Sequence, residues 1–302
     1  NMGVIAAACD YVYVMKDGKM IENGCADDIF YNPQTEYTKK LLSDATAEQL
    51  LVKEKVFAAQ ENPLFTVRHL KKRFQNEEGV NDVSFDICEG EVFALAGESG
   101  SGKTTLAKIL TGLEQPDSGE VFCRGERVDR KNRKRNKNMH GKVRMIFQDP
   151  YSSLNPCMTI NEMLTETLRA KEKQIKFDQK ERKKDRQRQI EQMLTRVGLS
   201  SLDGKRYPRE LSGGQRQKAA IARALLLEPE LLICDEAVSS LDAATRTQIL
   251  DLLLRVVKEK KIACLFISHD MALIRRISHR TGVLYKGTLA ECAKTRDLCR
   301  DP

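Results

Sequence analysis

The sequence predicts an α/β protein with a largely parallel sheet and a functional site at the carboxyl ends of its strands. Three apolar runs, at 92–96, 231–234 and 262–267, have the length and composition of buried strands, and helical stretches lie between them. Each run also ends in glycine-rich or polar residues. Because parallel strands present their carboxyl ends at one edge of a sheet, we expect these residues to meet there.

The composition is that of a soluble globular protein, and 302 residues allow two domains, or one domain and part of another. The formal net charge of +8 comes largely from segments 129–144 and 169–188. We interpret both as solvated surface, since no aromatic residues are interleaved with the charges and a nucleic-acid partner is therefore not favoured. None of the nine cysteines forms a C-x-x-C pair, which favours reduced thiols and a cytosolic protein.

The first 33 residues repeat the last 33. Residues 270–302 align with 1–33 without a gap and with seven identities, where average composition predicts about two. We therefore expect 1–33 to be the tail of a domain whose complete copy follows; the alternative is a helix-and-hairpin unit that recurs by chance. A polar helical stretch, Thr38 to Ala59, then leads to Asn62-Pro63, where the proline favours a boundary.

The chain after this boundary begins with short alternating runs, 64–67 and 83–87, which predict strands of a half-exposed sheet. Phe74 lies between them. The buried strand at 92–96 then leads into Gly97-Glu98-Ser99-Gly100-Ser101-Gly102-Lys103-Thr104-Thr105, followed by a helix over 104–113. In this pattern glycines turn the backbone N–H groups toward phosphate oxygens, the lysine reaches the β- and γ-phosphates, and the threonine hydroxyl binds Mg²⁺.

Later strands also deliver polar groups. The strand predicted at 143–147 ends at Gln148-Asp149-Pro150, and a charged helical region follows from Ile160 to Val197. Ser212 opens a helix that continues to Leu227, and its exposed N–H groups have the form of an anion site. The strand at 231–234 runs into Asp235-Glu236, and two like charges at a buried strand end repel each other unless a cation is present. A helix is predicted from Ala243 to Val257, and the strand at 262–267 ends in Ser268-His269-Asp270.

These motifs together resemble the ATP-binding cassette (ABC) ATPases over nearly all of 64–302. The resemblance is carried, in the family's order, by GESGSGKT (97–104), Gln148, LSGGQ (211–215), LLICDE (231–236), SSLD (239–242) and His269. It implies a P-loop NTPase fold with a RecA-like core, an antiparallel β subdomain and an α-helical signature subdomain at about 150–225. MIFQDPYSSLNP (145–156) and IFYNPQTEYTKKLL (29–42) are similar to the branch that energises oligopeptide, dipeptide and nickel importers, which often carries two cassettes.

The resemblance implies ATP and Mg²⁺ as ligands. Glu236 would be the general base, His269 would contact the γ-phosphate, and Gln148 would sense Mg²⁺ and the attacking water. Mg²⁺ would be held by Thr104, Gln148 and Asp235. Phe74, where the family usually has tyrosine, would stack on adenine or else be a core phenylalanine. The remaining nucleotide contacts would come from Gly97, Ser99, Gly100, Ser101, Gly102, Lys103, Thr104, Thr105, Ser212, Gly213, Gly214, Gln215 and Asp242.

The resemblance also implies partners and domain organisation. Ser212 to Gly214 would close on ATP bound to a second cassette, either in a homodimer or in the tandem cassette of a parent chain. Residues 1–62 would be the C-terminal remnant of a preceding cassette plus a linker, 63–302 would be the complete one, and the sequence would be a fragment of a tandem protein. The region from Gln148 to Pro156 would contact membrane permease subunits, served by an extracytoplasmic substrate-binding protein.

The expected function is thus the ATPase subunit of an importer for peptides or related small solutes, cytoplasmic and peripheral on the inner face of the cell membrane. The alternative is a soluble ABC ATPase that remodels a protein or ribonucleoprotein complex without a permease. A non-catalytic binding module is disfavoured, because Glu236 and His269 are both present.

Overall fold

A computed structural model describes the chain over residues 9–42 apart from 17 and 40, 63–128 apart from 75–77, and 142–299 apart from 173–178. Most of the helix predicted over Thr38 to Ala59 and most of the basic segment 129–144 lie outside these residues.

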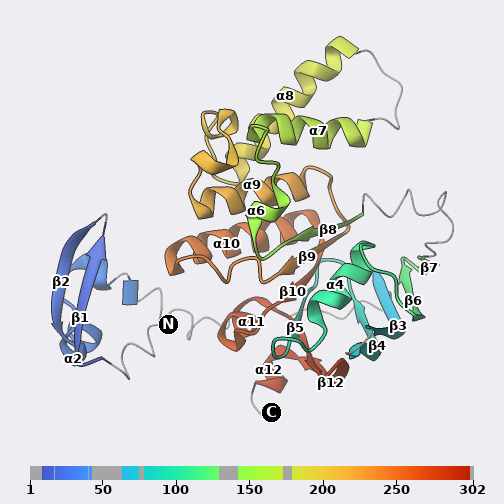
Figure 1. Cartoon of the computed structure of the whole chain (residues 1–302), viewed down its shortest axis with the longest axis horizontal. Coiled ribbons are helices and arrows are strands. Elements are labelled where there is room, and N and C mark those ends of the chain that lie inside the picture. The colour runs from blue at the N-terminus through green and yellow to red at the C-terminus, as the bar shows by residue number, and fades with distance from the viewer. Residues whose placement is uncertain are drawn as a thin grey trace.

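The described chain contains a six-stranded sheet with the spatial order β12-β11-β5-β10-β9-β8 (Figure 1). Its neighbouring strands are parallel except for β11 and β12, which form an antiparallel hairpin at one edge. The largely parallel sheet predicted from the apolar runs is therefore present. The bounds are β5 Val92–Ala96, β8 Val143–Ile146, β9 Leu231–Asp235, β10 Ala263–Ile267, β11 Arg280–Tyr285 and β12 Thr288–Lys294.

The two faces of this sheet are buried against different layers. On β9 and β10, alternate residues such as Cys234 and Phe266 point into a core shared with helices, whereas Ile233 and Leu265 point into a second core. This division follows from the two-residue period of a strand. The helices of the first core are α7 Ile160–Glu172, α8 Gln179–Arg196, α9 Gly213–Leu225, α10 Ala243–Lys260 and α11 Met271–Ile277.

The second core is closed by helix α4 (Lys103–Thr111) and by a four-stranded antiparallel sheet. This sheet has the order β4-β3-β6-β7, and its inward residues include Val67, Leu70 and Phe85. Its strands are β3 Phe65–Arg73, β4 Glu78–Ile87, β6 Ser118–Cys123 and β7 Glu126–Arg127.

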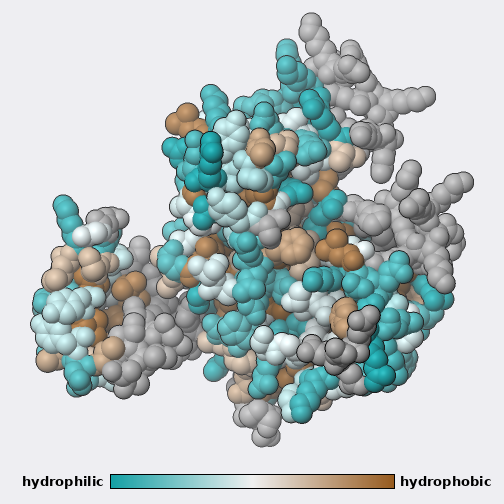
Figure 2. Space-filling view, viewed as in Figure 1, coloured by the Kyte–Doolittle hydropathy of each residue, from teal (hydrophilic) through white to brown (hydrophobic). Residues whose placement is uncertain are grey.

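Helices α6 (Pro150–Ser153) to α9 form the segment between β8 and β9, and in Figure 1 α7 and α8 extend away from the sheet. The region predicted as helical over 160–197 contains two helices, and the described surface at this end of the molecule is largely hydrophilic (Figure 2). Asp203 ties the segment together, because its carboxylate accepts hydrogen bonds from Ser200, Arg206 and Gln215.

Several predicted ends differ from the observed ones by a few residues. The helix predicted over 104–113 starts at Lys103 and ends at Thr111, since Gly112 adopts a left-handed conformation with φ 91° that terminates it. Helix α10 extends beyond the predicted Val257 to Lys260, where Lys261 takes the left-handed cap position. Such ends depend on backbone conformation at one residue, which apolar periodicity does not report.

The N-terminal segment forms a hairpin of β1 (Tyr11–Lys16) and β2 (Lys19–Cys25) followed by α2 (Ala26–Tyr31). Under the gap-free alignment of the repeat, β1 and β2 coincide residue for residue with β11 and β12, and α2 starts at the position of α12 (Thr295–Leu298). The irregularity in strand pairing, between Val14 and Met15, also falls at the equivalent place, between Val283 and Leu284. The sequence repeat is therefore also a repeat of structure.

A carboxylate anchors the residues that follow the N-terminal hairpin. Glu22 accepts hydrogen bonds from the Thr35 hydroxyl (2.7 Å) and the Gln34 N–H (2.6 Å). These bonds, with that of the Thr35 hydroxyl the strongest, lower the pKa of Glu22 to about 2. Gln34 and Thr35 are thus held on the hairpin by a group that stays ionised at neutral pH.

Candidate functional site

Four neighbouring strands bring the predicted site residues to one edge of the central sheet. In the order β5-β10-β9-β8 the strands are parallel, so their carboxyl ends lie side by side. The glycine-rich loop 97–102 follows β5, Ser268-His269 follows β10, and Asp235-Glu236 ends β9. Gln148 follows β8 with an exposed side chain. The expectation that the polar groups would gather at strand ends therefore agrees with the structure.

The loop 97–102, called here the phosphate loop, has no room for side chains at two of its glycines. Gly97 and Gly102 have φ angles of 152° and 102°. A Cβ at Gly97 would overlap the carbonyl oxygen of Leu284, and one at Gly102 would overlap that of Gly79. The loop is therefore packed between β4 and the β11–β12 hairpin, and the Gly287 N–H also donates to the Ser101 carbonyl at 3.0 Å. These supports could not be predicted from the sequence, because no local motif signals them.

Lys103 is buried and reaches back into its own loop. Its Nζ donates to the carbonyl oxygens of Gly97 (2.7 Å) and Glu98 (2.6 Å). Burial lowers the pKa of Lys103, while the negative charges of Glu236 and Asp235 act in the opposite direction. An ammonium held inside a ring of backbone groups at a helix N-terminus fits a phosphate ligand. Ser99 and Thr104 are exposed, and Thr105 is half-buried.

Asp235 and Thr104 provide the donor set expected for Mg²⁺. Burial raises the pKa of Asp235, a hydrogen bond from Thr104 lowers it, and the neighbouring Glu236 raises it further. Carboxylate and hydroxyl oxygens are the hard ligands that Mg²⁺ takes beside phosphate. Such a cation would offset the repulsion between this buried carboxylate and its neighbour, so these residues fit the metal predicted from the sequence.

We predict that Asp235→Asn raises the Tm of the nucleotide-free protein at pH 7, by about 2–4 °C for a gain of about 1 kcal/mol. The raised pKa means that the folded state disfavours the ionised carboxylate, and this destabilisation is present at neutral pH and absent below the unfolded value of 3.8. Asparagine keeps an acceptor for Thr104 but carries no charge.

Thermal melts at pH 7 and pH 3.5 test this, with the exposed Asp10→Asn as control. The difference in Tm between variant and native protein should be much smaller at the lower pH. Mg²⁺ with ATP should stabilise the native protein more than the variant. A lower Tm for Asp235→Asn at pH 7 contradicts the prediction.

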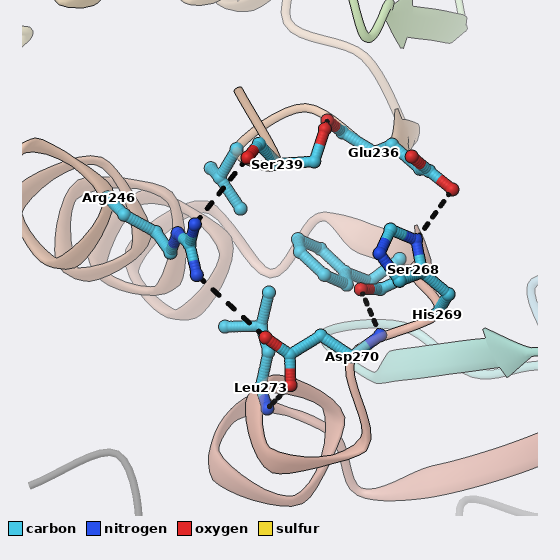
Figure 3. A pocket seen from close by; sticks show the side chains of 9 residues that line it. Glu236, Ser239, Arg246, Ser268, His269, Asp270 and Leu273 are labelled. Carbon is cyan, nitrogen blue, oxygen red and sulfur yellow. Dashed lines mark hydrogen bonds and ion pairs between the residues drawn. The ribbon is translucent and has the colours of Figure 1, made fainter. Parts of the chain in front are cut away.

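Glu236 and His269 form a pair at the ends of adjacent strands. His269 Nδ1 lies 3.0 Å from Glu236 Oε1, and Figure 3 shows the two side chains turned toward each other. Glu236 has φ 47°, a left-handed conformation that a non-glycine residue adopts at an energetic cost of order 1–3 kcal/mol. Its N–H donates to the Ile267 carbonyl (3.0 Å), which holds the strained residue at the end of β10.

A small open pocket lies beside this pair (Figure 3). It is bounded by residues that end β9 and β10 and by the first turns of α10 and α11: Glu236, Val238, Ser239, Arg246, Phe266, Ser268, His269, Asp270 and Leu273. Of these, Glu236 and His269 were given roles from the sequence, and Ser239, Ser268 and Asp270 belong to the strand-end segments that the sequence also points to. The remaining lining residues could not be predicted, because no local motif marks them: Val238, Arg246, Phe266 and Leu273.

The residues of LSGGQ begin helix α9. The Ser212 hydroxyl accepts from the Gln215 N–H (3.3 Å), and the Gln215 side chain accepts from the Ser212 N–H (2.9 Å). Ser212 is thus the N-cap predicted from the sequence, and with Gln215 it forms a capping box. Gln215 also donates to Asp203, so its side chain is engaged within the helical segment. The Ser212 side chain is exposed, and Gly213 has no close neighbour that would block a ligand.

Two further predicted residues lie apart from the carboxylates. Phe74 is 43% exposed and its ring packs on Gly79, whose carbonyl faces Gly102 of the phosphate loop. This places an exposed aromatic ring next to the loop, as base stacking requires. Asp242 caps α10 by accepting from the Thr245 N–H at 2.9 Å, a bond that lowers the pKa of Asp242.

Comparison with known protein families shows to which family this chain belongs. A family model described as "ABC transporter" matches residues 80–239, more than half of the chain, including the phosphate loop, LSGGQ and Asp235-Glu236. The chain belongs to the ABC transporter family. The predicted family and the predicted α/β cassette fold are confirmed. Within the described residues of this ABC cassette, no helix combines the length and apolar composition of a membrane span.

The relatives of this ABC cassette include import proteins. The glutathione import ATP-binding protein GsiA of Escherichia coli K12 is 37% identical over all of this chain, and that of Shigella flexneri is 38% identical. The chain spans about half the length of these curated relatives, 53% in each case. Their names confirm the predicted resemblance to the importer branch.

Solved structures agree with the fold. The dimeric MJ0796, described as a bacterial ABC transporter cassette, is 26% identical with a TM-score of 0.68, covering 77% of this chain and 99% of its own. MJ0796 is also known in a post-hydrolysis state bound to ADP and Pi. CbiO1 of Clostridium perfringens is 23% identical with a TM-score of 0.70, covering 80% and 92%, and shows the shared fold.

Proposed function

We propose that this chain is the ATP-hydrolysing subunit of an ABC importer. One observation carries the proposal: three neighbouring strands, β5, β9 and β10, deliver Lys103, Asp235, Glu236 and His269 to a single edge of the sheet. A cation for phosphate, a carboxylate for metal, and a carboxylate paired with an imidazole are the components that ATP hydrolysis needs. That the post-hydrolysis structure of MJ0796 holds ADP and Pi supports the same chemistry in a cassette of this fold.

Each residue has a defined part in this reaction. The phosphate loop and Lys103 bind the phosphates, and Phe74 stacks on the base. Glu236 accepts the proton of the attacking water. His269, which is paired with Glu236 and more exposed than it, holds the γ-phosphate. Thr104, Gln148 and Asp235 would hold Mg²⁺, which supplies charge neutralisation for the phosphates. Phosphoryl transfer of this kind depends mainly on positioning and electrostatics.

A second cassette completes each ATP site in this proposal. Ser212, Gly213 and Gly214 present an exposed serine and the first-turn N–H groups of two glycines at the start of α9, a helix of 13 residues whose N-terminus suits an anion. The dimeric form of MJ0796 supports closure of this surface on the ATP of a partner. The partner is a second copy of the chain or the other cassette of a longer parent protein.

The division at residue 62 belongs to the same proposal. The register of β1 and β2 equals that of β11 and β12, and the relatives have about twice the length of this chain. Met15 is 59% exposed, whereas its equivalent Leu284 is 1% exposed beside β5. The hairpin of 1–62 thus carries an apolar position that a complete cassette buries, which supports its assignment as the tail of a preceding cassette.

The proposed contact with a membrane permease is inferred from the position of segment 148–156 next to the ATP site. Helix α6 lies in the segment 148–156 directly after Gln148, so a permease that contacts it is linked to the ATP site through one residue. Peptides or related small solutes are the proposed cargo, because the relatives are named for glutathione import. A substrate-binding protein would deliver this cargo, and the chain would work at the inner face of the membrane.

The test is to purify the full-length parent protein carrying Glu236→Gln, trapped with ATP, from membranes and to identify its stable partners by mass spectrometry. Integral-membrane permease subunits that remain bound, together with a cognate binding protein, support import. The control is a Lys103→Ala parent, which should not retain ATP.

If only soluble partners are recovered and ATP is still retained, the proposed ATPase activity is supported and the proposed role in import is contradicted. This outcome would favour an ABC ATPase that remodels a protein or ribonucleoprotein complex.

A further inference from the structure

Arg246 connects the loop after β9 to the loop after β10. It lies in the first turn of α10, and its guanidinium donates to the carbonyl oxygens of Ser239 (3.5 Å) and Leu241 (3.3 Å). On its other side it lies 3.8 Å from the carboxylate of Asp270. Figure 3 shows Arg246 between the two loops, with a contact to each.

Both loops lead back to the Glu236–His269 pair. The N–H (3.1 Å) and hydroxyl (2.9 Å) of Ser239 donate to the Glu236 carbonyl. Asp270 adjoins His269, its N–H donates to the Ser268 hydroxyl (3.0 Å), and its carboxylate caps α11 at the Leu273 N–H (3.1 Å). The contacts therefore close a ring from Glu236 through Ser239, Arg246 and Asp270 to His269 and back to Glu236.

The hydrogen bonds and ion pair of Arg246 are suited to fixing the distance between the loops that follow β9 and β10. A guanidinium is planar and always charged, and it presents its donors in a rigid fork. Its side chain is 23% exposed, so a charged partner at 3.8 Å is only partly screened. Among the contacts of the described residues in this ring, Arg246 is the side chain that joins the 239–241 loop to the 268–270 loop.

The same helical turn also contacts the start of α9. A Cβ built on Gly214 would lie 2.5 Å from Thr245 Cγ2, so the glycine packs directly on Thr245. Thr245 and Arg246 are consecutive. One turn of α10 thus contacts the LSGGQ segment through Thr245 and the Glu236–His269 ring through Arg246.

We propose that Arg246 is a positioning residue for ATP hydrolysis, which sets the spacing between Glu236 and His269. Because Arg246 shares a helical turn with Thr245, this spacing changes when the LSGGQ segment moves. The inference rests on the proposed ATPase function and adds to it a link, within one cassette, between the surface facing the second cassette and the hydrolytic pair.

The experiment compares Arg246→Ala, Arg246→Lys and the control Arg255→Ala in the full-length protein. Arg255 lies on the same helix with an exposed side chain. Arg246→Ala should lower kcat about tenfold and change KM for ATP less than about threefold, because misplaced catalytic groups weaken the reaction more than ground-state binding. Lysine should restore part of the rate, and Arg255→Ala should match the native protein.

Two further measurements separate positioning from structure. Arg246→Ala should lower the residual rate of a Glu236→Gln protein by less than twofold, since its effect acts through Glu236. In the nucleotide-free protein, it should shift the NMR signals of the His269 imidazole, whereas Arg255→Ala should not.

An unchanged kcat for a folded Arg246→Ala protein overturns the inference and leaves the ATPase standing. So does a tenfold loss that is repeated in full in the Glu236→Gln background. If the native protein binds ATP without hydrolysing it, the proposed function fails instead. In that case the His269 signals alone decide, and their insensitivity to Arg246→Ala overturns the inference.

Discussion

Replacing Glu236 with glutamine is expected to lower kcat for ATP hydrolysis by about 10²- to 10⁴-fold, the range for loss of a general base. Glutamine has the same shape and keeps an acceptor for His269, which now lies 3.0 Å from the carboxylate. It cannot take a proton from water. Because the phosphate loop and Lys103 are untouched, ATP should bind with its native affinity.

Steady-state hydrolysis and direct nucleotide binding, measured on the same preparation, test this. Glu126→Gln, in the short strand β7, is the control, because that side chain is exposed and belongs to none of the motifs. A variant that hydrolyses ATP within tenfold of the native rate would exclude Glu236 as the base. A variant that also loses ATP affinity would assign Glu236 to binding.

Gly102→Ala is expected to weaken ATP binding by about 10²-fold or more. The added Cβ would overlap the Gly79 carbonyl, and the φ of 102° is unfavourable for any side chain. Left-handed backbone costs about 1–2 kcal/mol and overpacking about 1–3 kcal/mol more. The loop must therefore shift, and Lys103, the next residue, shifts with it.

Gly125→Ala is the matched control for this substitution. Gly125 has a φ of 78° and no atom within 4 Å of its Cβ position, so it carries the backbone strain without the overlap. Isothermal titration with ATP and Mg²⁺ should show native affinity for Gly125→Ala and weak or absent binding for Gly102→Ala. Equal affinities in the two variants would mean that the contact with β4 does not shape the site.

Together the two substitutions separate the parts of the proposed site. Glu236→Gln should remove hydrolysis and keep binding, whereas Gly102→Ala should remove binding and hydrolysis with it. Arg246→Ala should fall between them, with hydrolysis slowed and binding kept.

Much of this protein is determined by local sequence. The phosphate loop, the N-cap at Ser212 and the carboxylates at the end of β9 depend on residue types at short spacing, and each forms where the sequence predicts it. The strand ends gather at one edge because parallel β-α units require it. The repeat of the hairpin could also be read directly, since it is a gap-free alignment.

Only the tertiary structure decides what surrounds these motifs. Gly79 of β4 and Leu284 of β11 close the phosphate loop from two different sheets, and Arg246 reaches Asp270 across the sheet edge. Glu236 likewise combines a left-handed backbone with a hydrogen bond from its N–H to the carbonyl of Ile267, on the neighbouring strand. Such contacts depend on the order of strands in the sheet and on which helix turn packs on which loop. Local propensity and apolar periodicity carry no information about that order, because they describe one element at a time.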